Sequence, residues 1–471
     1  MIDEAVFYLP IRELHARIRS GKLSIIELTA ACLKRLEDVG GRLNAVVTLT
    51  SDLAMKQAEV ATKELKEGKD RGFLHGIPCG VKDLLATKGI PTTWGAAPYR
   101  DQVFDFDATV VQKLRQAGAI LCAKLAMVEL AGGFGYNNAD ASFTGPGLTP
   151  WNRKFWSGGS STGPGSAVAA GCVPFAIGSE TSGSIITPAA YCGVTGLRPT
   201  YGRVSRYGAM ALCWSLDKLG PMARSADCCH LVLRAIHGAD PNDPTSVTRD
   251  LNYDVELPKT RFKIGIVKGA TDGVQPAVKK NFEDSLKELA KFADIADGEV
   301  PLPDLPFGAA IGTIVSAEGA SAFRDLIESG RVKGLQNEAD RTGGYAGLMV
   351  PAVDYLQALR VRGRMKRAMA ETYEKFDALI APSRSTVAPP IDKDFDQSYP
   401  GFHGGAGTVI PAGNAVGQPA VSVPNGFGEN GLPTGIQFTG KIWSEEVLLV
   451  LARLYQRETE WHLKKPLATS P

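Results

Sequence analysis

The sequence lacks the features of an exported or membrane-spanning chain. It begins Met1-Ile2-Asp3-Glu4, with no basic start and no apolar stretch after it, and no run of about 18 apolar residues occurs anywhere. It also lacks blocks of like charge, because 52 Lys and Arg are interspersed with 50 Asp and Glu. Such a balance favours neither nucleic acid nor an anionic membrane as a partner. We therefore expect a cytoplasmic protein with no nucleic-acid and no membrane partner.

The residues that bind metals or form disulfides are sparse or poorly spaced. None of the eight cysteines stands in a Cys-x-x-Cys pair, and there are only six histidines. Several cysteines lie in apolar runs, which predicts reduced thiols packed as small hydrophobic groups. No Cys/His cluster offers a metal site, so we expect no metal ion.

Glycine, by contrast, is abundant, and the pattern of apolar runs is that of an α/β protein. The chain has 52 glycines in 471 residues, above the usual share of about 7%, and much of the excess lies between Gly132 and Gly208. Short apolar runs alternate with stretches of helical periodicity. The pattern predicts helices over 8–70 (with a capping box at Ser24), 352–375 and 445–458, strands over 119–123, 173–177, 262–267 and 377–382, and a Pro-rich loop over 239–260.

Two turns rich in glycine and hydroxyl groups, 157–166 and 178–184, present the strongest chemical signal. The first has the G-x-x-x-x-G spacing of a phosphate-binding loop, but Pro164-Gly165 follows where that loop needs Lys-Ser/Thr. It also contains a G-x-S-x-G pattern centred on Ser161, the pattern of a Ser-His-Asp hydrolase. That elbow must directly follow a strand, and 152–156 is a poor strand.

A third mechanism activates serine with lysine and needs no histidine. At an unperturbed pKa near 10.4, only roughly one lysine in 2,500 is neutral at pH 7, so the lysine must be buried. Lys82 lies in the apolar, Gly-rich run 75–83, where a solvated lysine would be unusual. The residues thus offer Lys82 as a base for a serine in one of the two turns.

Several motifs, in order along the chain, resemble the amidase signature family. The two serines Ser160 and Ser184 are 24 residues apart, as in that family. The matching segments are Gly76-Ile77-Pro78, Val81-Lys82-Asp83, Gly158-Gly159-Ser160-Ser161, Gly183-Ser184-Ile185, 188–193, 196–205, 215–221, 414–420 and 431–437.

The resemblance implies a fold and a catalytic mechanism. The fold would be α/β: a single compact domain, 1–471, with a large mixed twisted central sheet flanked by helices. Its parts would be an N-terminal helical segment (8–70), a signature core (71–225) and a C-terminal portion (262–465) that completes the sheet. Ser184 would be the acyl nucleophile, Lys82 the general base, and Ser160, after a cis peptide bond, the proton shuttle between them. No cofactor is implied, and the oxyanion hole would consist of the backbone N–H groups of Thr181, Ser182, Gly183 and Ser184.

The chain departs from the family pattern at positions that bear on the substrate. Ser182 replaces a glycine, which requires a negative φ there, and Ile186 replaces an arginine, which favours an uncharged, fairly apolar acyl portion. Gly132 and Gly133 stand where relatives often carry a bulkier residue, which predicts a wider acyl pocket. Arg362, on the predicted helix 352–375, is a candidate anchor for a substrate carboxylate.

The resulting hypothesis is a hydrolase of carbon–nitrogen acyl bonds in a small-molecule amide, aryl amide or carbamate, acting through an acyl-enzyme; a homodimer stays open. Two alternatives remain. One is the A-type component of a tRNA-dependent glutamine amidotransferase complex, but that component carries an acidic residue where this chain has Gly405, three positions before Thr408. The other is a Ser-His-Asp esterase that uses Ser161.

Overall fold

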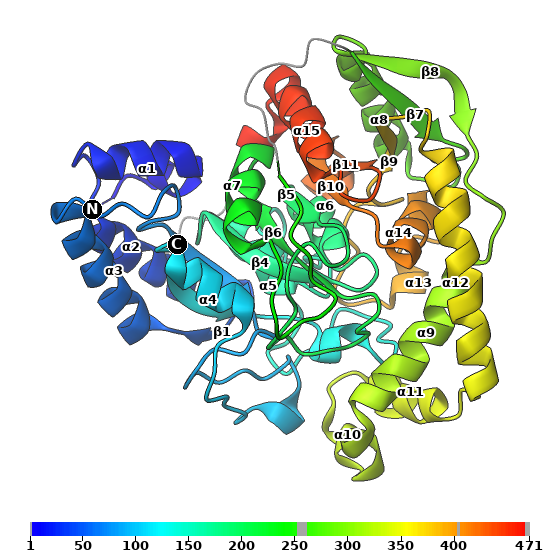
Figure 1. The fold of residues 1–471 in the computed structure, drawn as a ribbon, viewed down its shortest axis with the longest axis horizontal. Helices are drawn as coiled ribbons and strands as arrows, with labels where there is room; N and C mark the ends of the chain where they lie inside the picture. The colour runs from blue at the N-terminus through cyan, green and yellow to red at the C-terminus, as the bar shows by residue number, and fades with distance from the viewer. Residues whose placement is uncertain (1, 252–260, 403–405, 467–471) are drawn as a thin grey trace.

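The computed structural model describes residues 2–251, 261–402 and 406–466. Its strands form one 11-stranded sheet in the order β1-β3-β2-β4-β6-β5-β10-β11-β9-β7-β8 (Figure 1). The strands are β1 (Val46–Leu49), β2 (Pro78–Lys82), β3 (Ile120–Leu125), β4 (Phe175–Glu180), β5 (Thr195–Arg198), β6 (Lys218–Ala223), β7 (Phe262–Val267), β8 (Ala293–Val300), β9 (Ala378–Pro382), β10 (Ala420–Phe427) and β11 (Pro433–Thr439).

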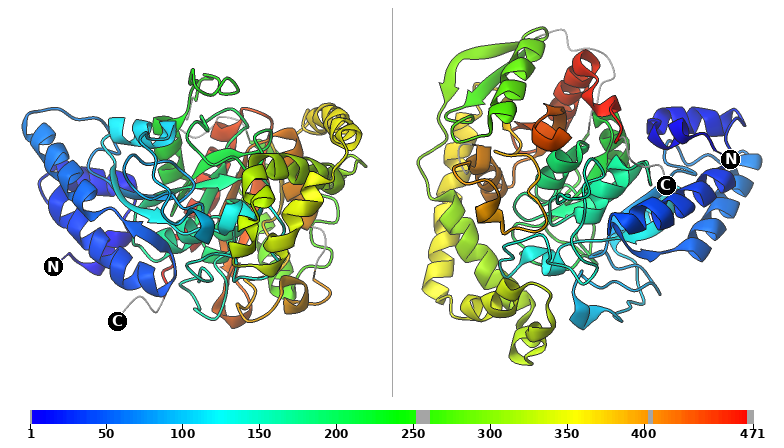
Figure 2. Two further views of the ribbon diagram at one scale, coloured as in Figure 1. Left: turned by 90° about the horizontal axis from the view of Figure 1, so that it is seen from below. Right: turned by 180° about the vertical axis from the view of Figure 1, so that it is seen from behind.

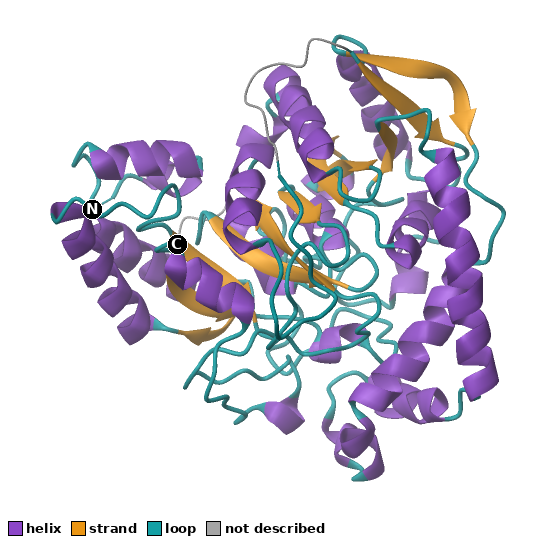
Figure 3. Ribbon diagram, in the orientation of Figure 1, coloured by secondary structure: helices purple, strands orange, loops and turns teal. Residues whose placement is uncertain are grey.

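The sheet is mixed, which confirms the predicted fold class. Strand β2 runs parallel to both β3 and β4, and β7 runs parallel to β8 and β9, whereas the strands between these groups pair antiparallel. The 8–70 segment contributes β1, the signature core contributes β2 to β6, and the C-terminal portion contributes β7 to β11. All three predicted parts therefore share one twisted sheet (Figure 3).

Helices cover both faces of the sheet. α15 contacts both α7 and α8 over one face, and α5 and α6 lie together on the other (Figures 1 and 2). The helices are α1 (Ile11–Arg19), α2 (Ile25–Arg35), α3 (Ser51–Lys66), α4 (Thr109–Gln116), α5 (Thr162–Ala169), α6 (Ile186–Cys192), α7 (Ala226–Ile236), α8 (Pro276–Leu289), α9 (Phe307–Ala322), α10 (Arg324–Glu328), α11 (Glu338–Leu348), α12 (Ala352–Thr372), α13 (Phe395–Ser398), α14 (Ala406–Val416) and α15 (Glu445–Thr459).

Most predicted elements agree with the structure, and one prediction is wrong. The strand predicted over 262–267 is β7, and the helices predicted over 352–375 and 445–458 are α12 and α15. The Ser24 hydroxyl accepts a hydrogen bond from the N–H of Glu27, as a helix cap does. The segment 8–70, however, is not wholly helical, because Val46–Leu49 forms an edge strand antiparallel to β3. A four-residue strand is too short to show a period, and tertiary pairing with β3 decides its state.

Two other predictions concern loops and thiols. Residues 239–251 form neither a helix nor a strand, and the remainder of the predicted loop, 252–260, lies outside the described residues. All eight cysteines are free and buried, as the apolar context predicts. Across the described residues, no helix has both the length and the apolar character required to cross a membrane.

Candidate active site

The site begins where two parallel strands end side by side. Lys82 is the last residue of β2, and its neighbour β4 pairs with it in parallel, with Val81 opposite Ile177. Because parallel strands present their carboxyl ends at one edge of the sheet, Lys82 meets the turn that follows β4. Its Nζ donates hydrogen bonds to Ser160 Oγ at 2.7 Å and to Ser179 Oγ at 2.8 Å. The two turns singled out in the sequence therefore converge on one lysine.

Lys82 is fully buried, and burial governs its charge. Desolvation lowers the pKa of Lys82 to about 7, against the opposing influence of the Asp217 and Glu180 carboxylates. A large fraction of Lys82 is thus neutral near pH 7. That is the condition that a lysine must meet to act as a general base.

Ser160 follows a cis peptide bond to Gly159 and precedes α5. The preceding Gly158 has a φ of +82°, and a Cβ there would lie 2.8 Å from the Cα of Pro188, at the start of α6. Only glycine fits this approach of backbone to backbone. The Gly-Gly-Ser run therefore packs against α6 and presents the Ser160 hydroxyl to Lys82.

Ser184 lies in the turn between β4 and α6, at the wall of a cavity of about 580 Å³. It is 9% exposed, whereas Ser160 and Lys82 are fully buried, so Ser184 is the member of the predicted triad that a substrate can reach. Its carbonyl accepts a hydrogen bond from the N–H of Ser161 at 3.3 Å. Among the hydrogen bonds of the described residues, Lys82–Ser160 is made and a Ser160–Ser184 hydroxyl bond is not.

The turn 181–184 has the free donors that an oxyanion hole needs. Within the described residues, the backbone N–H groups of Ser182, Gly183 and Ser184 donate to no protein acceptor. Gly183 has a φ of +90°, and Ser182 does not have a positive φ, as the replacement of glycine there required. The Thr181 hydroxyl donates to Asp217 Oδ1 at 2.6 Å, which holds the start of the turn.

Glu180, which precedes this turn, fixes its far side. One carboxylate oxygen accepts from the N–H groups of Ile185 and Ile186 at 2.8 and 3.0 Å. The other accepts from Arg198 at 2.9 Å and from Asn414 at 2.8 Å. Burial raises the pKa of Glu180, but Arg198 and Lys218 outweigh it and hold that pKa at about 2. Sequence reasoning did not reveal this role, although Glu180 stands inside the Gly/Ser-rich turn 178–184.

Arg198→Met is expected to destabilise the fold strongly. It leaves the Glu180 carboxylate buried with its guanidinium partner gone, and breaking a fully buried ion pair in this way costs about 3–5 kcal/mol. Chemical denaturation at pH 7 measures this cost. As a control, Arg261→Met breaks the exposed pair with Asp294 and should cost less than about 1 kcal/mol. Equal losses in both variants would contradict the prediction.

The same pair predicts a loss of stability in acid. Because the pKa of Glu180 is lower in the fold than its ordinary 4.5, its contribution is complete above about pH 4.5 and disappears as pH falls toward about 2. In Arg198→Met this dependence should be weaker. Denaturation curves between about pH 6 and about pH 2.5 on both proteins test the prediction, and parallel curves would contradict it.

The remaining sequence candidates lie around this centre rather than in the cavity. Ile186 is fully buried with Ile410 and Ala420, beneath the site. A Cβ at Gly132 would lie 2.4 Å from the Tyr136 ring, so Tyr136 occupies the space that the widening prediction had left open.

Gly133 and Arg362 are also absent from the residues that line the Ser184 cavity. Gly133 faces Leu212, whose Cδ1 would lie 2.6 Å from a Cβ. The Arg362 guanidinium donates to the backbone carbonyls of Ala415 and Ser215 at 2.6 and 2.7 Å. Its role as a carboxylate anchor stays a prediction.

Ser161 has the surroundings of a structural hydroxyl. It is fully buried, donates to the carbonyl of Ser179 at 3.2 Å and accepts from the N–H of Ser179. No histidine among the described residues bonds to it; His403 and Gly405 lie outside them. The esterase alternative therefore has no support in the described geometry.

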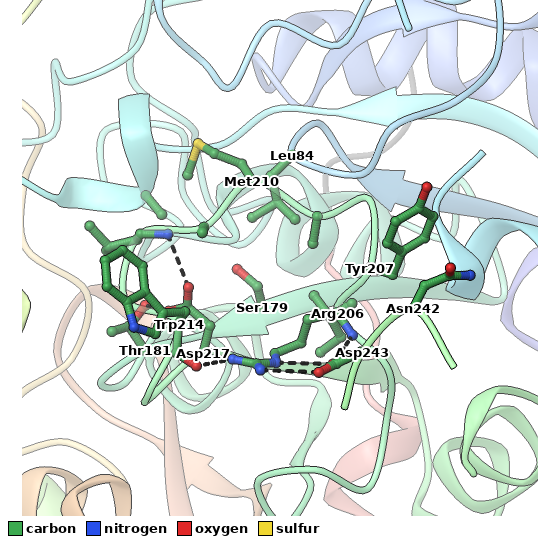
Figure 4. A pocket seen from close by; sticks show the side chains of 15 residues that line it. Leu84, Ser179, Thr181, Arg206, Tyr207, Met210, Trp214, Asp217, Asn242 and Asp243 are labelled. Carbon is green, nitrogen blue, oxygen red and sulfur yellow. Dashed lines mark hydrogen bonds and ion pairs between the residues drawn. The ribbon is translucent and has the colours of Figure 1, made fainter. Parts of the chain in front are cut away.

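A second cavity, of about 180 Å³, reaches the same strand from another direction (Figure 4). Ser179, Thr181 and Asp217 line it together with the apolar side chains of Leu84 and Met210. Ser179 bonds to Lys82 and also borders this cavity, so the cavity approaches the lysine without passing Ser184. No local pattern in the sequence signals either cavity, because both are lined by residues distant in the chain.

Comparison with known proteins agrees with this geometry. The family model described as Amidase matches residues 27–449. The chain belongs to the amidase signature family. Its members act on carbon–nitrogen bonds, so the coarse functional prediction is confirmed at the level of the family.

Individual relatives cover nearly the whole chain. The A component of the glutamyl-tRNA(Gln) amidotransferase of Acinetobacter baumannii is 36% identical over 97% of both chains. Among solved structures, one from work on a vestigial protein complex and the origins of an s-triazine catabolic enzyme has a TM-score of 0.87 at 29% identity, covering 95% of this chain and 98% of its own. The native peptide amidase of Stenotrophomonas maltophilia has a TM-score of 0.82 at 29% identity, covering 98% and 99%.

Proposed function

We propose that the chain hydrolyses small amides through an acyl-enzyme on Ser184. The observation that supports this most directly is the buried Lys82, which is bonded to Ser160 and whose pKa is about 7. Neutral Lys82 accepts the Ser160 proton, and Ser160 accepts the proton of Ser184 as its Oγ attacks the substrate carbonyl carbon. The N–H groups of 182–184 stabilise the alkoxide that forms.

The second half of the reaction uses the same groups in reverse. As the alkoxide collapses, the carbon–nitrogen bond breaks and the proton returns from Lys82 through Ser160 to the leaving nitrogen. A water molecule then attacks the Ser184 ester, gives its proton to the relay, and releases the carboxylic acid. Aryl amides and carbamates present the same carbonyl to Ser184 and are included in the proposal.

A fluorophosphonate probe tests the nucleophile. We expect intact mass measurement to show one adduct on the parent protein and none on Ser184→Ala. An adduct that persists in Ser184→Ala would place the nucleophile at Ser160 or Ser161. If the parent forms no adduct, the serine is not activated and the proposal fails.

The curated relatives favour a second candidate, in which the chain is the A-type component of a glutamine-dependent amidotransferase. Their names state that role, at 35–36% identity over nearly the full length. The difference is measurable as ammonia release by the chain alone from glutamine and from benzamide. Turnover of benzamide by the lone chain supports a free-standing amidase. Turnover of glutamine that needs added partner proteins and tRNA supports the amidotransferase component.

A further inference from the structure

The cavity at Ser184 has an aromatic wall. Trp156 and Phe395 stack with ring centroids 4.7 Å apart, and Tyr136 meets the Phe395 ring edge-on at 5.8 Å. The aromatic residues that line the cavity are Tyr136, Trp156, Tyr191, Phe395, Tyr399 and Phe402. Flat rings on several sides favour a flat ligand, because aromatic groups gain most from offset or edge-to-face contact with one another.

The same wall holds polar donors that have no acceptor. The indole Nε1 of Trp156 and the Nε of Arg384 are buried, and neither has a hydrogen-bond partner among the described residues. Buried donors without partners are costly in proteins, and a ligand acceptor can remove that cost. The cavity therefore combines flat apolar surface with unused hydrogen-bond donors.

Arg384 also brings a positive charge with no matching carboxylate. No acidic side chain of the described residues lies within ion-pair distance of it, and its Cζ lies 5.9 Å from the centroid of the Tyr191 ring. Asp396 is the acidic residue of the lining, and it is exposed, so water screens its charge. A guanidinium held against a ring presents its planar fork to an anion, and a carboxylate matches that fork.

We propose that this cavity binds a benzoate-like part of the substrate, a flat ring that bears a carboxylate, with Arg384 as its anchor. The inference rests on the proposed hydrolysis at Ser184 and extends it to a substrate class. It also revises the expectation of an uncharged acyl portion, which was drawn from Ile186, because Ile186 is buried beneath the site and Arg384 lines the cavity. The ring belongs either to the acyl part, as in 4-carboxybenzamide, or to the amine part, as in 4-acetamidobenzoate.

Three small probes separate charge from shape. Sodium benzoate has both the ring and the carboxylate, benzyl alcohol has the ring alone, and cyclohexanecarboxylate has the charge on a puckered ring. We expect benzoate to slow the labelling of Ser184 by the fluorophosphonate, and the other two to do so at least about tenfold less effectively. Arg384→Met should weaken protection by benzoate at least about tenfold, while Arg261→Met, an exposed arginine of the far sheet edge, should not change it.

Calorimetric titration of benzoate into Ser184→Ala repeats the test without any need for labelling. A failure of the parent to label therefore counts against the hydrolase proposal, while benzoate binding still decides this one. Equal benzoate affinity in the Ser184→Ala protein and in the same protein carrying Arg384→Met overturns the proposed anchor, as does stronger binding of benzyl alcohol than of benzoate. Hydrolysis of 4-carboxybenzamide and 4-acetamidobenzoate, each against its uncharged parent amide, then tells which side of the scissile bond the ring occupies.

Discussion

Ser184→Ala is expected to lower kcat/KM for amide hydrolysis by about a millionfold, the loss typical of removing a serine nucleophile. The acyl-enzyme cannot form without the Ser184 Oγ, and no other hydroxyl at the centre can replace it. Ser160 is fully buried against Lys82, and the Ser161 hydroxyl is bonded to the backbone of β4. Initial rates of benzamide or 4-carboxybenzamide hydrolysis on parent and variant measure the loss.

Ser161→Ala is the matched control. It removes a neighbouring buried hydroxyl whose partners are the N–H and carbonyl of Ser179, so it should keep activity within about tenfold. The Ser184→Ala protein should still bind benzoate, because the cavity wall is unchanged. A variant at Ser184 that keeps more than about a hundredth of the parent rate, or a Ser161 variant as inactive as Ser184→Ala, would contradict the assignment.

Lys82→Met should reduce kcat/KM by about 10⁴-fold, the upper range for loss of a general base. Methionine keeps the length and apolar stem of the lysine, so the buried site stays filled, but Ser160 loses its proton acceptor. Stability should not fall in proportion, because the variant removes a desolvated amine. Rates and denaturation curves measured on the same preparation separate the two effects.

The pH dependence of the parent tests the same residue. Because burial lowers the pKa of Lys82 to about 7 and only the neutral amine is a base, kcat/KM should rise with pH and level off above about pH 7. Lys124→Met is the control. This neighbouring buried lysine pairs with Asp83 at 3.1 Å and has no contact with Ser160, so its loss should reduce stability and leave the inflection near pH 7 in place. An unchanged profile in Lys82→Met would contradict the assignment.

Local signals in the sequence were sufficient for the catalytic centre. A lysine in an apolar, Gly-rich run must be buried, and Gly-Gly-Ser and Gly-Ser turns allow the close backbone approaches seen at Gly158 and Gly183. Periodicity likewise predicted β7, α12 and α15, because long or strongly apolar elements have a pattern of their own. The edge strand β1 escaped prediction because four residues have no measurable period, and pairing with β3 gives them their conformation.

The sequence by itself determined the family, the triad candidates and the oxyanion turn, since each is written in a few adjacent residues. Only the tertiary structure decided what surrounds them. Glu180, Arg198 and Asn414 lie far apart in the chain and meet because β4, β5 and α14 converge at one edge of the sheet. Arg384 and the aromatic wall likewise join the Ser184 turn through long-range packing, so no local pattern could show that Arg384, rather than Ile186, sets the charge of the cavity.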